Sequence, residues 1–560
     1  MISRAVVENG RISLVFSYDI SLIGKVKRLP DAKWSKAAKT WSSIATPYAA
    51  WQVVHGIGCR ETCGETRRLA AQWGAVRAGS ETEGIDLAGL WSHQQLACGA
   101  IAGRYAAILD MGMGTGKTLV AIRSQEHALA EMILVLCPKS VMGVWRREVE
   151  RWERRPGATC CVLDSGGSKD KAETLRATLR RHNNQPAGRG PLYVAVNYES
   201  AWREEVAAVL LGQKWDCVLC DESHRIKSHS AVTSKFAAAV GQVAKRRLCL
   251  TGTLLPHSPL DIFGQMRFLD AGIFGTSWVS FRTRYAKCSQ MFPSKVEKYI
   301  NQEELAERIS WFSYRCKSGD VLELPPKLFV DVPVSLCSHS ARAYRELERE
   351  LITEIEGGTV TATNALGRLV RLQQATSGYL PLDSENGEPK KLEVIGSDKE
   401  DALYDLLSDF PEHEPVVVFA TFRHDLERIR AVAEKLGRSY GEISGTESTG
   451  LTDRATMAEV DICGVQWQSG GVGIDLTRAA YCVFYSHTFN MGNYDQAVAR
   501  LHRPGQTRSV RYYRLIASGR VDEKIYTAID TRREVVEYVF ESMKKGELFD
   551  EQFSRLAGAK

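Results

Sequence analysis

The sequence predicts an α/β protein with two tandem lobes, each built on a mostly parallel sheet flanked by helices. Both halves of the chain alternate short apolar runs, typical of buried parallel strands, with helical stretches. In the first half, the runs at 106–109 and 215–220 each lead into a polar or glycine-rich turn. In the second half, residues 416–419 open the same alternation again. We expect functional side chains where these strands end.

Composition places the chain among ordinary globular proteins. It has 560 residues, of which 44% are hydrophobic and 25% charged, enough for several buried cores. The net charge of +6 suits a nucleic-acid partner, and it suits a near-neutral soluble protein almost as well. No apolar run approaches the ~18 residues that a membrane helix needs.

The N-terminal residues predict a cytoplasmic protein. Met1–Arg4 lead into no signal-peptide core. We find no basic localisation run and no chromatin-reading module, so we expect a bacterial or viral protein in its host's cytoplasm, with a nuclear location left open.

The 14 cysteines are scattered along the chain. Cys217 and Cys220 form a C-x-x-C, but it lies inside an apolar strand, and no second pair completes a zinc site at usable spacing. We therefore expect reduced, mostly buried thiols and no structural metal.

A glycine turn after the apolar run at 106–109 has the context of a phosphate-binding loop, and a helical pattern follows it from Leu119. Glycines let backbone amides approach phosphate oxygens at a helix N-terminus, while the lysine reaches the β and γ phosphates and the threonine hydroxyl binds magnesium. Met111 stands where the strict pattern has its first glycine, which leaves the amide cradle intact. The predicted nucleotide ligands are Gly114, Thr115, Gly116, Lys117 and Thr118.

An acidic pair follows the apolar run at 215–220. Asp221 would hold magnesium, and Glu222 would orient and deprotonate the attacking water, because both stand at the carboxyl end of a predicted strand. The alternative is a solvated turn, which the preceding strand disfavours.

Two arginines lie three residues apart in the segment Gln496–Gln506, a predicted helical run that the pair Pro504-Gly505 ends. At this spacing Arg500 and Arg503 would share one helix face and present two planar cations, which suits a polyphosphate. The alternative is a solvated charged face. With a phosphate loop in the same chain, we interpret the pair as arginine fingers.

The order of these segments resembles the Swi/Snf-type branch of superfamily 2 ATPases, over about residues 90–529. Six further segments match motifs of that family in the right order, and their number makes the resemblance specific. They are Leu90–Gln94, Ile133–Ser140, Leu250–Thr253, Asp320–Lys327, Val416–Phe419 and Gly470–Thr477.

The resemblance implies two RecA-like lobes that bind ATP and Mg²⁺. Gln94 would contact adenine, Gly473 and Asp475 would contribute to the nucleotide site, and Thr118 with Asp221 would hold the metal. It also implies contacts with the nucleic-acid backbone from Lys139, Ser140, Phe422, Gly445 and Ser469.

Three features depart from the family pattern. Leu254 and His257 stand where proline and asparagine are usual after Thr253, in the segment that resembles the coupling motif. Ser223 replaces a commoner alanine, a form that also resembles the annealing-helicase branch. The stretch between the lobes is short, which predicts a minimal motor.

The N-terminal stretch is predicted to be a small α+β module. Trp34 and Trp41 interleave with basic residues between Lys25 and Lys39, so they could stack on exposed bases or belong to a small core. The layout resembles the HARP module that precedes the motor in annealing helicases, which implies that Trp34 contacts nucleic acid.

These observations predict five segments. They are a HARP-like module at 1–55, a connector at 56–89, the first lobe at 90–335, a helical protrusion or linker at 336–400, and the second lobe at 401–560. Helices are expected at Tyr344–Ile355 and Leu366–Gln374, and a C-terminal bracing helix at Val535–Met543.

The resemblance implies a DNA-dependent ATPase that translocates on double-stranded or branched DNA, in repair, fork remodelling or strand annealing. An RNA helicase is disfavoured because the segment from His502 to Gln506 has the family's His-Arg-x-Gly-Gln form. A nucleotide-gated scaffold is disfavoured because the lysine, the glutamate and both arginines are all present.

Overall fold

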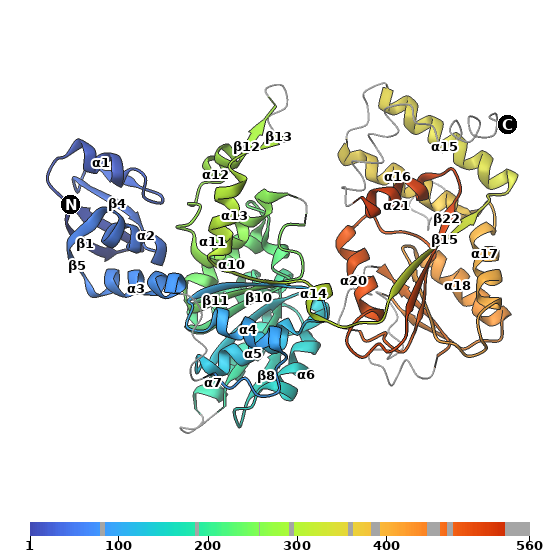
Figure 1. The fold of residues 1–560 in the computed structure, drawn as a ribbon, viewed down its shortest axis with the longest axis horizontal. Coiled ribbons are helices and arrows are strands. Elements are labelled where there is room, and N and C mark those ends of the chain that lie inside the picture. The colour runs from blue at the N-terminus through green and yellow to red at the C-terminus, as the bar shows by residue number, and fades with distance from the viewer. Residues whose placement is uncertain are drawn as a thin grey trace. The chain divides into compact units, whose positions relative to one another are not determined.

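The computed structural model describes nine stretches of the chain. They are residues 1–78, 85–184, 190–256, 258–289, 296–356, 362–381, 392–444, 460–467 and 474–531. The chain divides into two compact units, Met1–Leu322 and Glu323–Lys560, so the contact boundary falls before the predicted end of the first lobe at residue 335. Figure 1 shows the elements of each unit.

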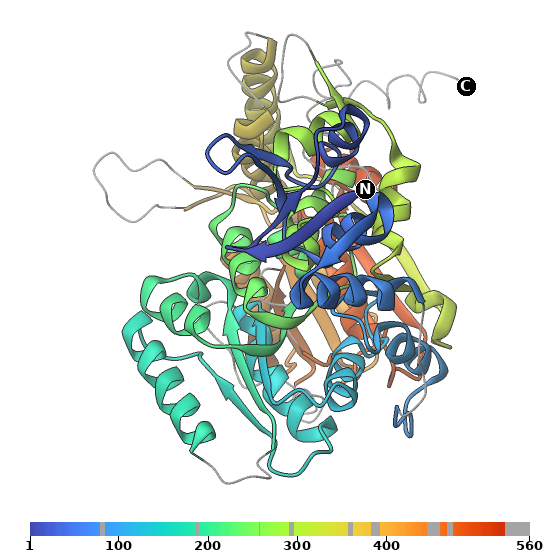
Figure 2. The same cartoon turned by 90° about the vertical axis from the view of Figure 1, so that its left-hand side faces the viewer.

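The first unit begins with a five-stranded sheet, which faces the viewer in Figure 2. Its strands, in spatial order, are β3 (Lys33–Ser35), β4 (Thr40–Ile44), β2 (Arg11–Val15), β1 (Ile2–Glu8) and β5 (Cys59–Thr62). The pairing of β1 with β5 is parallel and the others are antiparallel. The sheet therefore extends past residue 55, where the sequence predicted a connector to begin.

Helices cover this N-terminal sheet. They are α1 (Ile20–Val26), α2 (Pro47–Trp51), the π-helix η1 (Gln52–Gly58) and α3 (Gly64–Ala78). Ile2, Ile12, Leu14 and Val53 form its small core. Trp34, in contrast, is 47% exposed and lies 5.6 Å from Trp41 between ring centroids.

Aromatic side chains attach this N-terminal part to the larger sheet of the same unit. Trp73 of α3 is 2% exposed, and its ring centroid lies 5.5 Å from those of both Trp311 and Phe312. Asp270 adds polar contacts, because its Oδ2 accepts hydrogen bonds from Tyr105 Oη at 2.6 Å and Tyr48 N at 3.2 Å. The helices α2 and α3 thus reach the core of the larger sheet, while the N-terminal sheet keeps a core of its own.

The larger sheet of the first unit has seven strands, all paired in parallel. In spatial order they are β14 (Ser313–Cys316), β6 (Ala106–Met111), β11 (Ala244–Thr251), β10 (Trp215–Asp221), β7 (Met132–Cys137), β9 (Leu192–Asn197) and β8 (Thr159–Val162).

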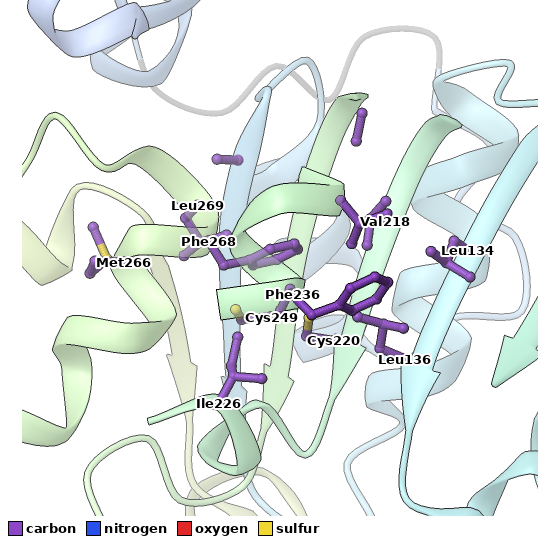
Figure 3. Packing of buried hydrophobic residues seen from close by; sticks show 14 of the residues in the cluster. Leu134, Leu136, Val218, Cys220, Ile226, Phe236, Cys249, Met266, Phe268 and Leu269 are labelled. Carbon is purple, nitrogen blue, oxygen red and sulfur yellow. The ribbon is translucent and has the colours of Figure 1, made fainter. Parts of the chain in front are cut away.

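This sheet is buried on both faces. Alternate residues of one strand enter opposite cores: Leu134 and Leu136 pack on one side, and Ile133 and Val135 on the other. Figure 3 shows the first of these cores, where Phe236 and Phe268 lie over the strands. Burial on both faces explains why the strands read as continuous apolar runs.

Helices and turns connect these strands. They are α4 (Ser92–Ile101), α5 (Lys117–His127), η2 (Lys139–Val141), α6 (Met142–Trp152), α7 (Ser168–Asn183), α8 (Tyr198–Ala201), α9 (Glu204–Gly212), η3 (Ser223–Ile226), α10 (Val232–Gln242), η4 (Pro259–Asp261), α11 (Ile262–Asp270), α12 (Trp278–Tyr285), α13 (Gln302–Ser310) and α14 (Ser318–Val321). A small antiparallel hairpin, β12 (Ala286–Cys288) and β13 (Val296–Tyr299), follows α12.

The second unit holds a six-stranded sheet, also all parallel. Its order is β15 (Lys327–Val334), β22 (Val510–Ala517), β21 (Tyr481–Phe484), β18 (Val416–Ala420), β20 (Ile462–Gln466) and β19 (Tyr440–Ile443). Two parallel sheets in tandem confirm the predicted α/β class.

The other elements of the second unit include the two helices expected between the lobes. The elements are α15 (Ser338–Glu356), α16 (Ala362–Thr376), β16 (Tyr379–Pro381), β17 (Leu392–Val394), α17 (Asp398–Ser408), α18 (Arg423–Lys435), α20 (Met491–Leu501) and α21 (Val521–Asp530). The predicted helix Val535–Met543 lies outside the described residues. Within the described stretches, no helix has the length and apolarity to cross a membrane.

Cys217 and Cys220 lie on β10 with buried side chains, as the apolar run around them predicts. Burial raises the pKa of both thiols, which favours their neutral form.

We expect Trp73→Ala to destabilise the first unit by about 3–5 kcal/mol, the cost of truncating a buried tryptophan. Chemical denaturation followed by tryptophan fluorescence and circular dichroism would measure the loss. Trp34→Ala is the matched control. Because Trp34 is 47% exposed, its truncation removes far less buried surface than that of Trp73. Equal losses in the two variants would contradict the packing of α3 into the core of the larger sheet.

Candidate active site

The glycine turn between β6 and α5 has the geometry of an anion cradle. Gly114 and Gly116 adopt positive φ angles of 78° and 87°, in the left-handed region that favours glycine. A Cβ atom on Gly116 would lie 2.4 Å from Gln94 Nε2, so a larger residue there would be strained by the positive φ and would displace the Gln94 side chain. The turn ends at the N-terminus of the eleven-residue helix α5, where free backbone N–H groups favour the binding of phosphate.

Lys117 lies at the mouth of this loop. Its ammonium donates to Met111 O at 2.9 Å and to Gly112 O at 3.2 Å, and the hydroxyl of Thr115 also donates to Gly112 O at 2.7 Å. These contacts are to neutral carbonyl oxygens. A triphosphate fits this loop, because it would place negative charge beside the ammonium.

Gln94 and His93 touch the loop from α4. Both side chains are buried; Gln94 Nε2 donates to Thr115 O at 3.1 Å, and His93 Nε2 lies 2.9 Å from the same oxygen. Gln94 Oε1 accepts from Trp91 N at 3.0 Å. The structure therefore brings Gln94 to the phosphate loop, and its role with adenine stays a prediction.

Asp221 is the last residue of β10, close to the same loop. Its carboxylate accepts from Trp145 Nε1 at 2.9 Å and from Glu222 N at 3.0 Å. Burial, together with the neighbouring Glu222 charge, raises the pKa of Asp221 to about 6, against the opposing effects of Trp145 and Lys117. A buried carboxylate beside a lysine fits a divalent cation, because the cation would compensate its charge.

Glu222 stands on a turn with φ 50° and ψ 55°, in the left-handed region that is uncommon for a residue with a side chain. Its Oε2 lies 3.4 Å from His224 Nδ1, and the side chain is 22% exposed. Strained backbone of this kind is concentrated at functional sites. A partly exposed carboxylate here is accessible to a water molecule, as a general base must be.

The first unit thus gathers most of the predicted nucleotide residues at one edge of its sheet. A Cβ on Gly252, which follows β11, would lie 3.6 Å from Lys117 Nζ, so the segment Thr251–Thr253 borders the loop as well. Lys139 begins η2 after β7, with an exposed side chain at the same carboxyl edge. For Ser140 the structure describes the backbone position in η2 and not the side chain.

The two arginines of the second unit are arranged differently from the sequence prediction. Helix α20 ends at Leu501, so Arg500 lies in its last turn while Arg503 lies beyond the helix. They therefore do not share a helical face, because Pro504 disfavours the helical conformation for the residue before it. Both side chains are half-buried.

Gln506 holds the turn that carries Arg503. Its Nε2 lies within hydrogen-bond distance of three carbonyl oxygens, those of Ala479 at 2.9 Å, Thr477 at 3.1 Å and Leu501 at 3.3 Å. Asp475 in turn accepts from Thr477 N at 3.0 Å and Thr477 Oγ1 at 2.7 Å. The arginine turn and the segment with Asp475 are therefore joined through Gln506, within one unit.

Other predicted residues of the second unit are less fully described. Phe422 precedes α18, and its ring lies 6.2 Å from that of Tyr379 between centroids. Gly445, Ser469 and Gly473 lie outside the described residues.

Sequence reasoning missed several contacts of the site. The indole N–H of Trp145 donates to the Asp221 carboxylate, a contact that the sequence analysis does not predict. Gln265 is not predicted either; its one signal is an uncharged polar side chain among the mostly apolar residues of α11. Asp425 was also overlooked, a fully buried carboxylate that accepts from Ser486 Oγ at 2.5 Å at the carboxyl edge of the second sheet.

Family models match most of the chain. The SNF2-related domain matches residues 93–378, and the helicase conserved C-terminal domain matches residues 398–505. The chain belongs to the SNF2-related family. The Swi/Snf-type resemblance is thereby confirmed. The first match covers the seven-stranded sheet and continues into the second unit through α16, and the second match covers β18 to β21.

Known relatives of this SNF2-related chain are distant and mostly longer. The Chromodomain-helicase-DNA-binding protein 1-like of Mus musculus is 26% identical over 84% of this chain and 51% of its own length. The DNA annealing helicase and endonuclease ZRANB3 of Bos taurus is 25% identical over 76% of this chain and 38% of its own length. The chain thus spans about half or less of these two relatives.

Among solved structures, the Sulfolobus solfataricus SWI2/SNF2 ATPase core in complex with dsDNA aligns with 84% of this chain and 97% of that chain. The identity is 23% and the TM-score 0.38. The fold of the SNF2-related chain rests on its own two parallel sheets.

We expect Asp425→Asn to remove a pH-dependent loss of folding stability that the buried carboxylate causes. Burial raises the pKa of Asp425 to about 6, so the folded state retains its proton more readily than the unfolded state. The stability that this proton confers is present at low pH and is lost as pH rises through the folded pKa. The substituted asparagine would keep an acceptor for Ser486 and carry no charge.

The free energy of unfolding of the Asp425→Asn variant, relative to wild type, should therefore rise by about 1–2 kcal/mol between about pH 5 and about pH 7.5. Urea denaturation of both proteins at each pH measures this difference. A difference that is the same at both pH values would contradict the raised pKa.

Proposed function

We propose that the SNF2-related chain is an ATP-dependent motor that translocates on double-stranded DNA. The observation that carries the proposal is the first-unit site, where the phosphate loop, Lys117 and Asp221 meet at one edge of a parallel sheet. The matches to an SNF2-related and a helicase C-terminal domain support a nucleic-acid motor over other ATPases.

In the proposed mechanism, amides of Gly114 to Thr118 and the Lys117 ammonium bind the phosphates of ATP, and Gln94 contacts the adenine. Thr118 and Asp221 would hold Mg²⁺, which supplies charge neutralisation of the phosphates when bound. The fit is supported by the amide cradle at the loop and by the buried carboxylate of Asp221, which hydrogen bonds from Trp145 Nε1 and Glu222 N orient.

Glu222 would act as the general base. It takes the proton of a water whose oxygen forms a bond to the γ phosphorus, while the bond from that phosphorus to the leaving ADP oxygen breaks. The exposure of its carboxylate and its turn beside Asp221 support this role.

Arg500 and Arg503 would neutralise charge that develops on the γ phosphate, with Gly473 and Asp475 contributing to the same nucleotide site. Fingers and base then come from different lobes, so hydrolysis would require closure, and reopening would shift one lobe along the strand. The joining of the arginine turn to Asp475 through Gln506 supports a shared role for these two segments.

We propose that the DNA is held mainly by backbone phosphates, since a motor that steps on any sequence cannot depend on base edges. Lys139 and Ser140 in the first lobe, and Phe422, Gly445 and Ser469 in the second, are the candidate contacts. The N-terminal module would add a preference for branched DNA through Trp34, whose half-exposed ring lies among basic residues.

We expect ATP hydrolysis to be stimulated by duplex or forked DNA more than by single-stranded DNA or RNA. Phosphate release measured with each nucleic acid at several salt concentrations tests this, and stimulation should fall steeply with salt because phosphate contacts dominate. Lys117→Ala and Glu222→Gln are the inactive controls. Stronger stimulation by RNA would favour an RNA helicase, and binding without turnover would favour a nucleotide-gated scaffold.

We expect Arg503→Ala to lower DNA-stimulated turnover by about three to five orders of magnitude, the range found for arginine fingers in other nucleotide hydrolases. The matched control is Arg511→Ala, an exposed arginine of β22 whose guanidinium contacts Tyr481 Oη. Wild-type turnover in the Arg503→Ala protein would remove Arg503 from the proposed site.

A further inference from the structure

Gln265 is a fully buried polar residue in the middle of α11, directly behind the turn that carries Glu222. Of the nine residues of α11, only Arg267 is not buried. A primary amide in such a position is costly unless its hydrogen bonds are satisfied. We therefore expect the hydrogen bonds of the Gln265 amide to explain why a polar residue is buried here.

The amide of Gln265 joins two segments that border the phosphate loop. Its Oε1 accepts from Ser223 Oγ at 2.6 Å, while its Nε2 donates to Leu254 O at 2.9 Å and lies 3.3 Å from Asp261 O. Carbonyl oxygens only accept, so the orientation of the amide is fixed.

Each end of this connection is next to a proposed catalytic group. Ser223 directly follows Glu222, the proposed base. Leu254 follows Thr251–Thr253, the segment whose Gly252 borders Lys117. The side chain of Gln265 thus connects the turn that carries Glu222 with the segment beside Lys117.

Helix α11 leaves the base turn little room to move. A Cβ on Gly264 would lie 2.0 Å from Ile226 O and 2.8 Å from Lys227 O, so the backbones of α11 and of the chain after Glu222 are in direct contact. At its far end, α11 is fixed by the hydrogen bonds of Asp270 with Tyr105 and Tyr48. Figure 3 shows Met266, Phe268 and Leu269 of α11 and Ile226 of the turn on the same side of the sheet.

We propose that Gln265 is a positioning residue, which holds the Glu222 turn in register with the segment Thr251–Leu254 during hydrolysis. The inference rests on the proposed ATPase activity of this site. The hydrogen bonds of the Gln265 amide go to Ser223, Leu254 and Asp261 and not to a predicted nucleotide ligand, so it acts on the placement of the base and not on ATP binding.

The test compares the isosteric variant Gln265→Glu with wild type in duplex-stimulated ATP hydrolysis. The new carboxylate faces two carbonyl oxygens without a proton to donate, which pushes the two segments apart. We expect the turnover number to fall about 10- to 100-fold, the effect of misplacing a reacting group by about 1 Å, with KM for ATP within about twofold of wild type.

The pH profile distinguishes positioning from general loss of structure. As pH falls, the buried carboxyl group introduced by Gln265→Glu regains a proton and can again donate to Leu254 O. The ratio of Gln265→Glu to wild-type turnover should therefore rise toward one at low pH. Ser223→Ala should give an intermediate loss, because the remaining bond to Leu254 is kept.

Gln125→Glu is the matched control. Gln125 is equally buried, but among the described residues the hydrogen bonds of its Nε2 go to Ala121 O and Ser124 Oγ of its own helix. This variant should lose similar thermal stability and keep the wild-type turnover number. If Gln265→Glu matches Gln125→Glu in turnover at every pH, the positioning role is refuted while the proposed function stands. Wild-type protein that hydrolyses no ATP with any nucleic acid refutes both.

Discussion

Burial of the first-unit sheet on both faces is the constraint on which the candidate site depends. Strands such as β7 and β10 send alternate side chains into two separate cores, so a charged group on either face is costly unless it is hydrogen-bonded, as Arg246 and Arg247 of β11 are. The polar residues of the candidate site lie instead at or just beyond strand ends. Because all seven strands run parallel, those ends meet at one edge, and Asp221, Gly252 and the phosphate loop come together there.

The parts of the site that depend on local sequence could be predicted. Glycines between an apolar run and a helix require a particular backbone, and Gly114 and Gly116 do adopt positive φ angles. An acidic pair directly after a buried strand likewise has few possible positions other than the carboxyl edge of the sheet. The Pro504-Gly505 pair predicts that the helical run ends near it, but α20 already ends at Leu501, so Arg503 lies outside the helix that the spacing of the arginines predicted for it.

Contacts between segments far apart in the sequence could not be predicted. Gln265 and Ser223 are 42 positions apart, and Tyr48 and Asp270 are 222 apart. The sequence around each of these residues does not indicate which residue it contacts. The N-terminal module was placed correctly as an α+β element by its alternating residues, but its fifth strand follows an irregular π-helix, which no simple periodicity reveals.

Asp270 has a further consequence for how this chain can be divided. Its carboxylate, with Trp73, Trp311 and Phe312, makes the N-terminal sheet and the first lobe parts of a single packed body. A protein shortened to begin near residue 85 would leave Trp311 and part of the Asp270 carboxylate uncovered, so the lobe would gain an apolar patch prone to self-association. The N-terminal module is thus a structural part of the first lobe. Exchanging the module between relatives would require the lobe surface that contacts it to be exchanged as well.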